Sequence, residues 1–83
     1  MKHAGSDALD SIEPMLEQIR RVPGLTERSR GVFYKRSKAF LHFHEDPSGM
    51  HADVRFDDDF ERYRVETSAE QEALLERLRQ DNG

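Results

Sequence analysis

With 83 residues, the chain is short enough for one domain with a thin hydrophobic core. It has no cysteine, which excludes disulfides, thiolate nucleophiles and cysteine-based metal sites, and which is typical of a reducing compartment. The net charge of -4 argues against general affinity for nucleic acid, and the sequence contains neither an apolar run of membrane-spanning length nor a signal-peptide h-region in residues 1–10, so we expect a cytoplasmic protein without membrane contact.

The first predicted element is a helix over about residues 11–21. Apolar side chains recur before and within it at spacings of three and four, as on one face of a helix: Leu9, Ile12, Leu16 and Ile19. Asp10 or Ser11 is expected to cap the helix, and Pro14 then falls in the first turn, where its missing N–H would have had no partner. The helix is expected to end before Pro23, which restricts the preceding residue to extended dihedrals.

Four strands are predicted after a polar connector over residues 24–31. Their side chains alternate between apolar and polar, and they cover residues 32–35, 39–45, 50–56 and 60–66. A tight turn around residues 36–38 joins the first two strands. The charged residues 57–59 form a solvated turn between the last two.

The last predicted element is a helix that begins at a capping box, formed by Ser68 with Gln71 or by Thr67 with Glu70. Its apolar stripe consists of Leu74, Leu75 and Leu78. The order α-β-β-β-β-α with short links predicts an α+β fold, in which an antiparallel four-stranded meander has both helices packed on one face.

Residues 1–83 are expected to form this single domain, with residues 1–8 and 81–83 frayed.

The segment from residue 39 to residue 56 predicts a hairpin with a defined register. Asp46-Pro47-Ser48-Gly49 matches a type I turn, and a two-residue primed turn is excluded because it would require a positive φ at proline. Glu45 then pairs with Met50, and the pairs His44–His51, Phe43–Ala52, His42–Asp53, Leu41–Val54 and Phe40–Arg55 follow. Because opposed residues point to the same side, the apolar members form the core face. The members of the outward face are Phe40, His42, His44, His51, Asp53 and Arg55.

Three of these outward side chains are imidazoles and one is a carboxylate, a combination that suits zinc or another divalent first-row metal. We therefore take His42, His44, His51 and Asp53 as a candidate metal site; no other cofactor is predicted. The alternatives are ordinary cross-strand electrostatics and a metal-free ligand or pH-sensing site. If His42 pairs with Asp53, the pKa of His42 should rise above its usual value of about 6.5.

Aromatic side chains are expected beside these histidines. Phe40 lies on the outward face next to Arg55, and either Phe33 or Tyr34 should lie opposite it. The face is therefore expected to be covered by a ligand, by a homodimer partner or by the chain's own connector. No phosphate-binding, serine-hydrolase or zincin motif occurs, so no catalytic residue is predicted and a non-enzymatic binding or interaction domain that uses the outward face is favoured.

Residues 20–38 carry seven basic residues and one acidic residue, a net +6, whereas the rest of the chain is -10. A solvated basic face beside an acidic one explains this dipole, and weak nucleic-acid binding is the alternative function. The basic residues that would carry it are Arg28, Arg30, Lys35, Arg36 and Lys38.

The first predicted hairpin reads Phe33, Lys35, Lys38 and Phe40 in sequence, with Ser37 at its turn. This pattern resembles the strand–turn–strand of the MmcQ/YjbR-like family of small bacterial proteins, roughly Phe-x-Lys-x-Gly-Lys-x-Phe-Ala, over less than half of the chain. The stretch FLHFHEDPSG…ADV also resembles a small family labelled luciferase-like, without any implied light reaction. MmcQ/YjbR-like proteins are often labelled DNA-binding, which implies that the basic residues would meet phosphates without reading bases. Neither resemblance implies catalytic residues.

Overall fold

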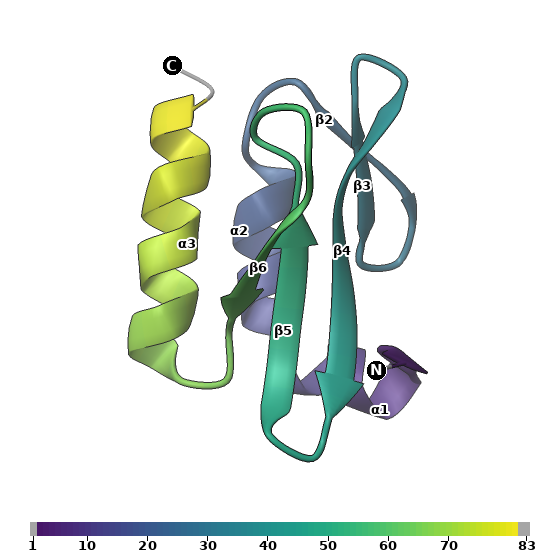
Figure 1. The fold of residues 1–83 in the computed structure, drawn as a ribbon, viewed down its shortest axis with the longest axis vertical. Coiled ribbons are helices and arrows are strands. Elements are labelled where there is room, and N and C mark those ends of the chain that lie inside the picture. The colour runs from purple at the N-terminus through teal and green to yellow at the C-terminus, as the bar shows by residue number, and fades with distance from the viewer. Residues whose placement is uncertain (1, 82–83) are drawn as a thin grey trace.

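The computed structural model describes residues 2–81 and consists of an antiparallel sheet with helices packed beside it (Figure 1). In chain order the elements are β1 (Lys2–His3), α1 (Ser6–Ser11), α2 (Glu13–Arg20), β2 (Leu25–Ser29), β3 (Val32–Lys35), β4 (Lys38–Asp46), β5 (Gly49–Val54), β6 (Glu61–Arg64) and α3 (Ser68–Asp81). Strands β2 to β6 follow one another across the sheet, and β1 pairs with β4. The predicted α+β class is confirmed, and the four predicted strands are β3 to β6.

The strand β2 lies in the segment that was predicted to be a polar connector, residues 24–31, so that prediction is wrong. β2 pairs antiparallel with β3 at the edge of the sheet, and most of its side chains are exposed. Leu25 is its only apolar residue, which leaves no alternation for sequence reasoning to detect. The sheet therefore begins one strand earlier than the predicted four-stranded meander.

The strand β1 lies within residues 1–8, which were expected to fray. Lys2 pairs with Glu45 and His3 with His44, along the C-terminal half of β4. A two-residue strand has no periodicity, so only its partner strand reveals it. The structure places residues 2–3 in β1, residues 6–8 in α1 and Asp81 in α3, and the expectation that residues 1–8 and 81–83 fray stays a prediction. Residues 1, 82 and 83 lie outside the described part of the chain.

The predicted helix over residues 11–21 corresponds to α2, and a further helix that was not predicted, α1, precedes it. Ile12, with the non-helical dihedrals φ -115° and ψ 17°, separates the two. Pro14 explains the division, because a proline inside a continuous helix would lack an N–H donor and would clash with the carbonyl of Asp10. Ile12 itself occupies the N-cap of α2 without a side-chain hydrogen bond, so the predicted capping by Asp10 or Ser11 is wrong. Helix α3 does begin as predicted, since Thr67 Oγ1 accepts from Glu70 N at 3.1 Å and Glu70 Oε1 accepts from Thr67 N at 3.0 Å.

One hydrophobic core joins the helices to the sheet. The buried residues of α2 and α3 are Met15, Leu16, Ile19, Leu74, Leu75 and Leu78. The buried apolar residues of β3, β4 and β5 are Phe33, Phe40, Leu41, Phe43, Met50, Ala52 and Val54. Helices α2 and α3 also contact each other and lie side by side in Figure 1. The candidate site described below lies on the opposite side of the sheet.

The β4–β5 hairpin has the predicted register. Five predicted pairs, from Glu45–Met50 to Leu41–Val54, occur, and a further pair, Asp46–Gly49, shortens the connection to Pro47-Ser48. Gly49 takes the positive φ of 124° that follows the turn, and the Asp46 carboxylate accepts from Ser48 N at 2.8 Å. Turn chemistry and hydrophobic alternation agree here, which is why the register could be predicted.

The β3–β4 hairpin departs from the prediction at Phe40. Phe33 pairs with Leu41 and Tyr34 with Ala39, so Phe40 is an extra residue in a β-bulge. The bulge turns Phe40 toward the core, where it is 5% exposed and its ring centroid lies 5.9 Å from that of Phe56. Phe33 is 1% exposed in the same core. The predicted outward position of Phe33 and Phe40 is therefore wrong.

Candidate functional site

The side of the sheet opposite the core, called here the outward face, carries two rows of polar side chains across neighbouring strands. In the first row His44 pairs with His3 of β1 and with His51 of β5. In the second row His42 pairs with Asp53. Strand β6 continues both rows, with Arg64 opposite His51 and Arg62 opposite Asp53. Since opposed residues share a side, the four predicted site residues do lie on one face.

Three imidazoles gather at one end of this face. The ring centroids of His42 and His44 are 4.8 Å apart, and His3 lies 4.8 Å from His44 and 5.9 Å from His42. One ring nitrogen of each lies within 4.8 Å of those of the other two. We call these residues the three-histidine cluster. Sequence reasoning missed His3, because it lies in the two-residue strand that carries no pattern.

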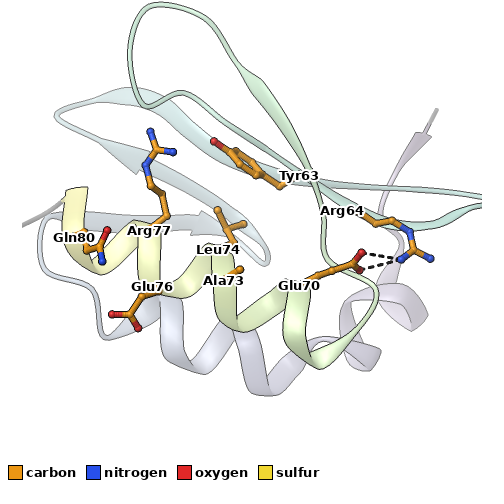
Figure 2. A pocket seen from close by; sticks show the side chains of 8 residues that line it. All are labelled: Tyr63, Arg64, Glu70, Ala73, Leu74, Glu76, Arg77 and Gln80. Carbon is orange, nitrogen blue, oxygen red and sulfur yellow. Dashed lines mark hydrogen bonds and ion pairs between the residues drawn. The ribbon is translucent and has the colours of Figure 1, made fainter.

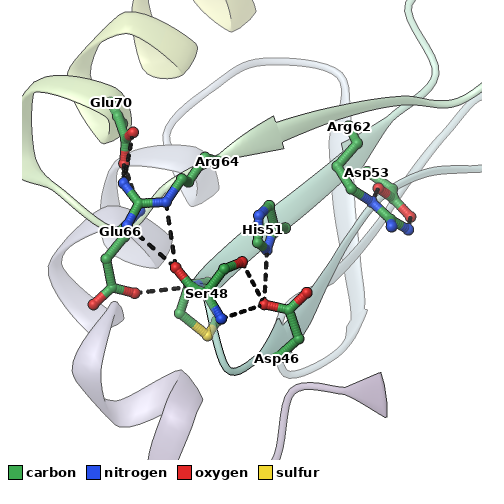
Figure 3. A network of polar contacts seen from close by, with 9 residues as sticks. Asp46, Ser48, His51, Asp53, Arg62, Arg64, Glu66 and Glu70 are labelled. Atoms are coloured by element: carbon green, nitrogen blue, oxygen red, sulfur yellow. Dashed lines mark hydrogen bonds and ion pairs between the residues drawn. The ribbon is translucent and has the colours of Figure 1, made fainter. Parts of the chain in front are cut away.

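The side chains of Asp53 and His51 face Arg62 and Asp46 (Figure 3). The Asp53 carboxylate accepts two hydrogen bonds from Arg62, at 2.8 and 2.9 Å. The other predicted member, His51, turns its Nδ1 toward Asp46 Oδ1 at 3.9 Å. The structure therefore brings together two of the four predicted metal ligands, His42 and His44, and adds His3 to them.

Asp53 still contacts the cluster through His44, whose Nε2 lies 3.1 Å from Asp53 Oδ2. The approach is close but lacks the alignment of a good hydrogen bond, because His44 Nε2 has no hydrogen-bond partner by angle. Histidines that bind metals usually turn their second ring nitrogen toward a carboxylate, which orients the ring. Asp53 has the position of such an orienting group for His44, with Arg62 holding its two oxygens.

Several buried imidazole nitrogens have no partner. They are Nδ1 of His42, Nδ1 and Nε2 of His44, and Nδ1 of His51. His44 is 9% exposed, so neither of its nitrogens is solvated. A buried polar atom without a hydrogen bond costs roughly 1–3 kcal/mol. A ligand that bound to a ring nitrogen of His42 and to one of His44 would remove that cost at those two atoms.

The surroundings of His42 favour the neutral form of its imidazole. Burial lowers the pKa of His42, and the neighbouring His44 lowers it further against the opposing effect of Asp53. The expectation of a raised pKa was therefore wrong, because Asp53 approaches His44 rather than His42 and its charge is compensated by Arg62. Hydrogen bonds from Arg62 in turn lower the pKa of the Asp53 carboxyl. A neutral imidazole has a free lone pair for a metal ion at neutral pH.

The connector between β5 and β6 covers part of the cluster. The ring of Phe60 lies 5.0 Å from that of His42, and the Arg55 guanidinium lies 5.1 Å from the centroid of Phe60. This segment differs from the connector predicted as a possible cover, residues 24–31, which forms β2 at the edge of the sheet. Phe60 is itself 41% exposed, so the cover is incomplete. Tyr34, also predicted at this face, is half-buried beneath the Arg28 guanidinium at 4.4 Å.

Arg64 fixes the hairpin turn next to the outward face (Figure 3). Its guanidinium donates to the Ser48 carbonyl and, at 2.9 and 3.1 Å, to the Glu70 carboxylate at the start of α3. Glu66 accepts from Met50 N at 2.8 Å. These contacts hold the β4–β5 turn against α3 and leave Arg64 committed to a structural position.

Two of the five predicted nucleic-acid residues, Arg30 and Lys35, form ion pairs within the chain. Arg30 contacts Asp10 at 2.7 Å and Glu13 at 2.6 Å, and the hydrogen bonds from Arg30 and Arg20 lower the pKa of Glu13 to about 2. Lys35 contacts Asp81 at 3.2 Å. The remaining three, Arg28, Arg36 and Lys38, are exposed, and the Arg28 guanidinium lies over the ring of Tyr34.

A cavity of about 590 Å³ lies between β6 and α3 (Figure 2). Tyr63 and Leu74 form its apolar wall, and Arg77 and Glu76 lie at its rim. Because Tyr63 pairs with Ala52, this cavity opens on the helix side of the sheet, away from the histidines. It contains neither an imidazole nor a pair of close carboxylates.

Comparison with protein-family models, with curated proteins and with solved structures found no match for this chain. The two family resemblances described above therefore stay predictions. Within residues 2–81, no helix combines the length and hydropathy needed to cross a membrane.

Proposed function

We propose that the chain is a binding domain whose outward face holds a divalent first-row metal ion, with His3, His42 and His44 as ligands. The main support is the gathering of three ring nitrogens within 4.8 Å of one another on a face where buried imidazole nitrogens lack hydrogen-bond partners. Imidazole is a ligand that zinc and its neighbours in the first row share. Zinc is the ion we propose for the first test.

Electrostatics and geometry support the proposal independently. Metal binding competes with protons, and the lowered pKa of His42 reduces that competition at neutral pH. Asp53 stands next to His44 as an orienting carboxylate. The cluster reaches the surface at His3, which is exposed and leaves a path for an ion to enter.

The spacing of the three ring nitrogens is wider than a tetrahedral zinc site requires. A tetrahedral site with nitrogens at about 2.0–2.1 Å from zinc places the nitrogens about 3.4 Å apart. The cluster, with separations of up to 4.8 Å, must therefore contract slightly on binding. Three protein ligands leave a fourth coordination position for water or another small ligand.

Isothermal titration of the metal-free protein with zinc at neutral pH tests this function. We expect one ion per chain, and a loss of at least about 100-fold in affinity in the double variant His42→Ala/His44→Ala, since two of three ligands are removed. His51→Ala is the matched control, because His51 is also a histidine of the outward face but lies outside the three-histidine cluster. It should bind zinc within about threefold of the wild type.

Equal zinc affinity in the double variant and the wild type would contradict the proposal. A loss in His51→Ala as large as in the double variant would instead favour the ligand set predicted from sequence, which includes His51 and Asp53, and would contradict the role of His3.

A further inference from the structure

We propose that the metal ion fastens the N-terminal strand to the sheet, so that metal binding and the docking of β1 on β4 are coupled. This inference rests on the proposed metal site. Two of its ligands, His42 and His44, belong to β4, whereas His3 belongs to β1. The ion would therefore join two elements rather than fill a site within one.

The contacts that hold β1 are few and polar. Beyond its two-residue ladder with β4, Ala4 N donates to Phe43 O at 3.2 Å and Gly5 N donates to Glu45 Oε2 at 2.8 Å. The latter bond is exposed, and so is His3. Leu9, six residues after His3, is the first buried side chain among those described in the N-terminal segment, and before it only the half-buried Ala4 and Ala8 pack against the core. A short strand with so little apolar contact is expected to open locally.

The ligands on β4 are held much more firmly. β4 is the longest strand. It pairs with β5 from Leu41 to Asp46 and with β3 from Lys38 to Leu41 (Figure 1). His42 and His44 are partly or fully buried there. When the cluster contracts around an ion, His3 is thus the ligand that moves, and β1 moves with it.

Thermodynamic linkage makes this coupling quantitative. The factor by which docking of β1 increases metal affinity equals the factor by which metal increases docking. His3→Ala reports the affinity of the site without its third ligand, and we expect a loss of at least about tenfold. Zinc should then slow the opening of β1 by a factor of the same order.

Hydrogen exchange measured by NMR on the full chain gives this factor directly. The backbone amides of Ala4 and Gly5 both donate to the β4 segment and report docking. With saturating zinc, we expect their exchange to slow by at least about tenfold relative to the same protein with a chelator. In His3→Ala the amides should exchange at the same rate with and without zinc, while in His51→Ala zinc should still protect them.

A variant that is not a metal ligand separates coupling from simple ligand loss. Glu45→Ala removes the acceptor of Gly5 N and so weakens docking. Because apparent affinity falls with the fraction of chains in the competent state, zinc should bind this variant several-fold more weakly. Glu45→Gln keeps an acceptor oxygen and should restore most of the affinity.

If zinc binds the wild type but leaves the exchange of the Ala4 and Gly5 amides unchanged, the proposed coupling between metal binding and β1 docking is wrong, although the metal site is supported. Equal zinc affinity in wild type and Glu45→Ala would also overturn it. Absence of zinc binding to the wild type would instead contradict the proposed function, and the coupling that rests on it would be contradicted as well.

Discussion

The two faces of the central strands β4 and β5 differ in how their buried side chains are satisfied. On the inner face Leu41, Phe43 and Val54 are buried in one continuous hydrophobic core. On the outward face His44 and Asp53 are also buried, yet both ring nitrogens of His44 lack a hydrogen bond. Packing accounts for every residue of the inner face, whereas stability alone does not account for the outward one. Such a local violation is expected where a binding site is retained at some expense of stability.

The largest effect should come from the inner face. Leu41 is 0% exposed, and Leu41→Ala leaves a cavity beneath the central strand. We expect the free energy of unfolding to fall by about 3 kcal/mol, measured by urea denaturation. Lys38→Ala is the control on the same strand, since Lys38 is exposed and its replacement should change stability by less than about 0.5 kcal/mol. A loss below about 1 kcal/mol in Leu41→Ala would mean that the two faces are not as different as the structure indicates.

The free energy of unfolding should depend on pH through His42 of the outward face. Because the folded pKa of His42 is lowered, the unfolded chain binds a proton there more readily than the folded chain. The corresponding stability is complete above the unfolded pKa of about 6.5 and is lost as pH falls through the folded pKa. The charged or titratable groups around His42 are His3, His44, Asp53 and Arg62.

Urea denaturation with a chelator present, between about pH 5 and pH 7, measures this effect. One proton contributes a slope of at most about 1.4 kcal/mol per pH unit, so the change is smaller than that of Leu41→Ala. His42→Asn should flatten the curve in this window. Stability that increases toward acid pH would require a raised pKa of His42 and would support the ion pair between the His42 imidazole and the Asp53 carboxylate that was predicted from sequence.

The extent of prediction also differs between regions. In the β4–β5 hairpin, turn residues and alternation specify the same register, so each pair from Leu41–Val54 to Glu45–Met50 could be predicted. In the β3–β4 hairpin, Arg36 and Ser37 both adopt positive φ, 53° and 68°, and Phe40 bulges inward against Phe56. Positive φ is uncommon for residues other than glycine, and the bulge depends on tertiary packing, so alternation alone could not show either.

The candidate site divides in the same way. His42 and His44 could be placed on one face because the strand period fixes them. His3 could not, since its position depends on a two-residue strand that forms only against β4. The contact of Asp53 with Arg62 could be predicted only in part: alternation in β6 places Arg62 and Arg64 on the outward face, but the register between β5 and β6 decides which of them lies opposite Asp53.

The smallest and most discriminating effect on stability should come from His44→Phe. Phenylalanine keeps a planar aromatic ring, somewhat larger than imidazole, but has no ring nitrogen, so the substitution removes two buried polar atoms that lack hydrogen-bond partners. Asp53 keeps both hydrogen bonds from Arg62. With a chelator present, we therefore expect the free energy of unfolding to stay equal or to rise by up to about 1 kcal/mol. With zinc present, the wild type should gain stability by mass action and the variant should gain less. If His44→Phe instead loses more than about 1 kcal/mol without metal, the nitrogens of His44 serve the fold, and the contrast between the two faces would have no functional meaning.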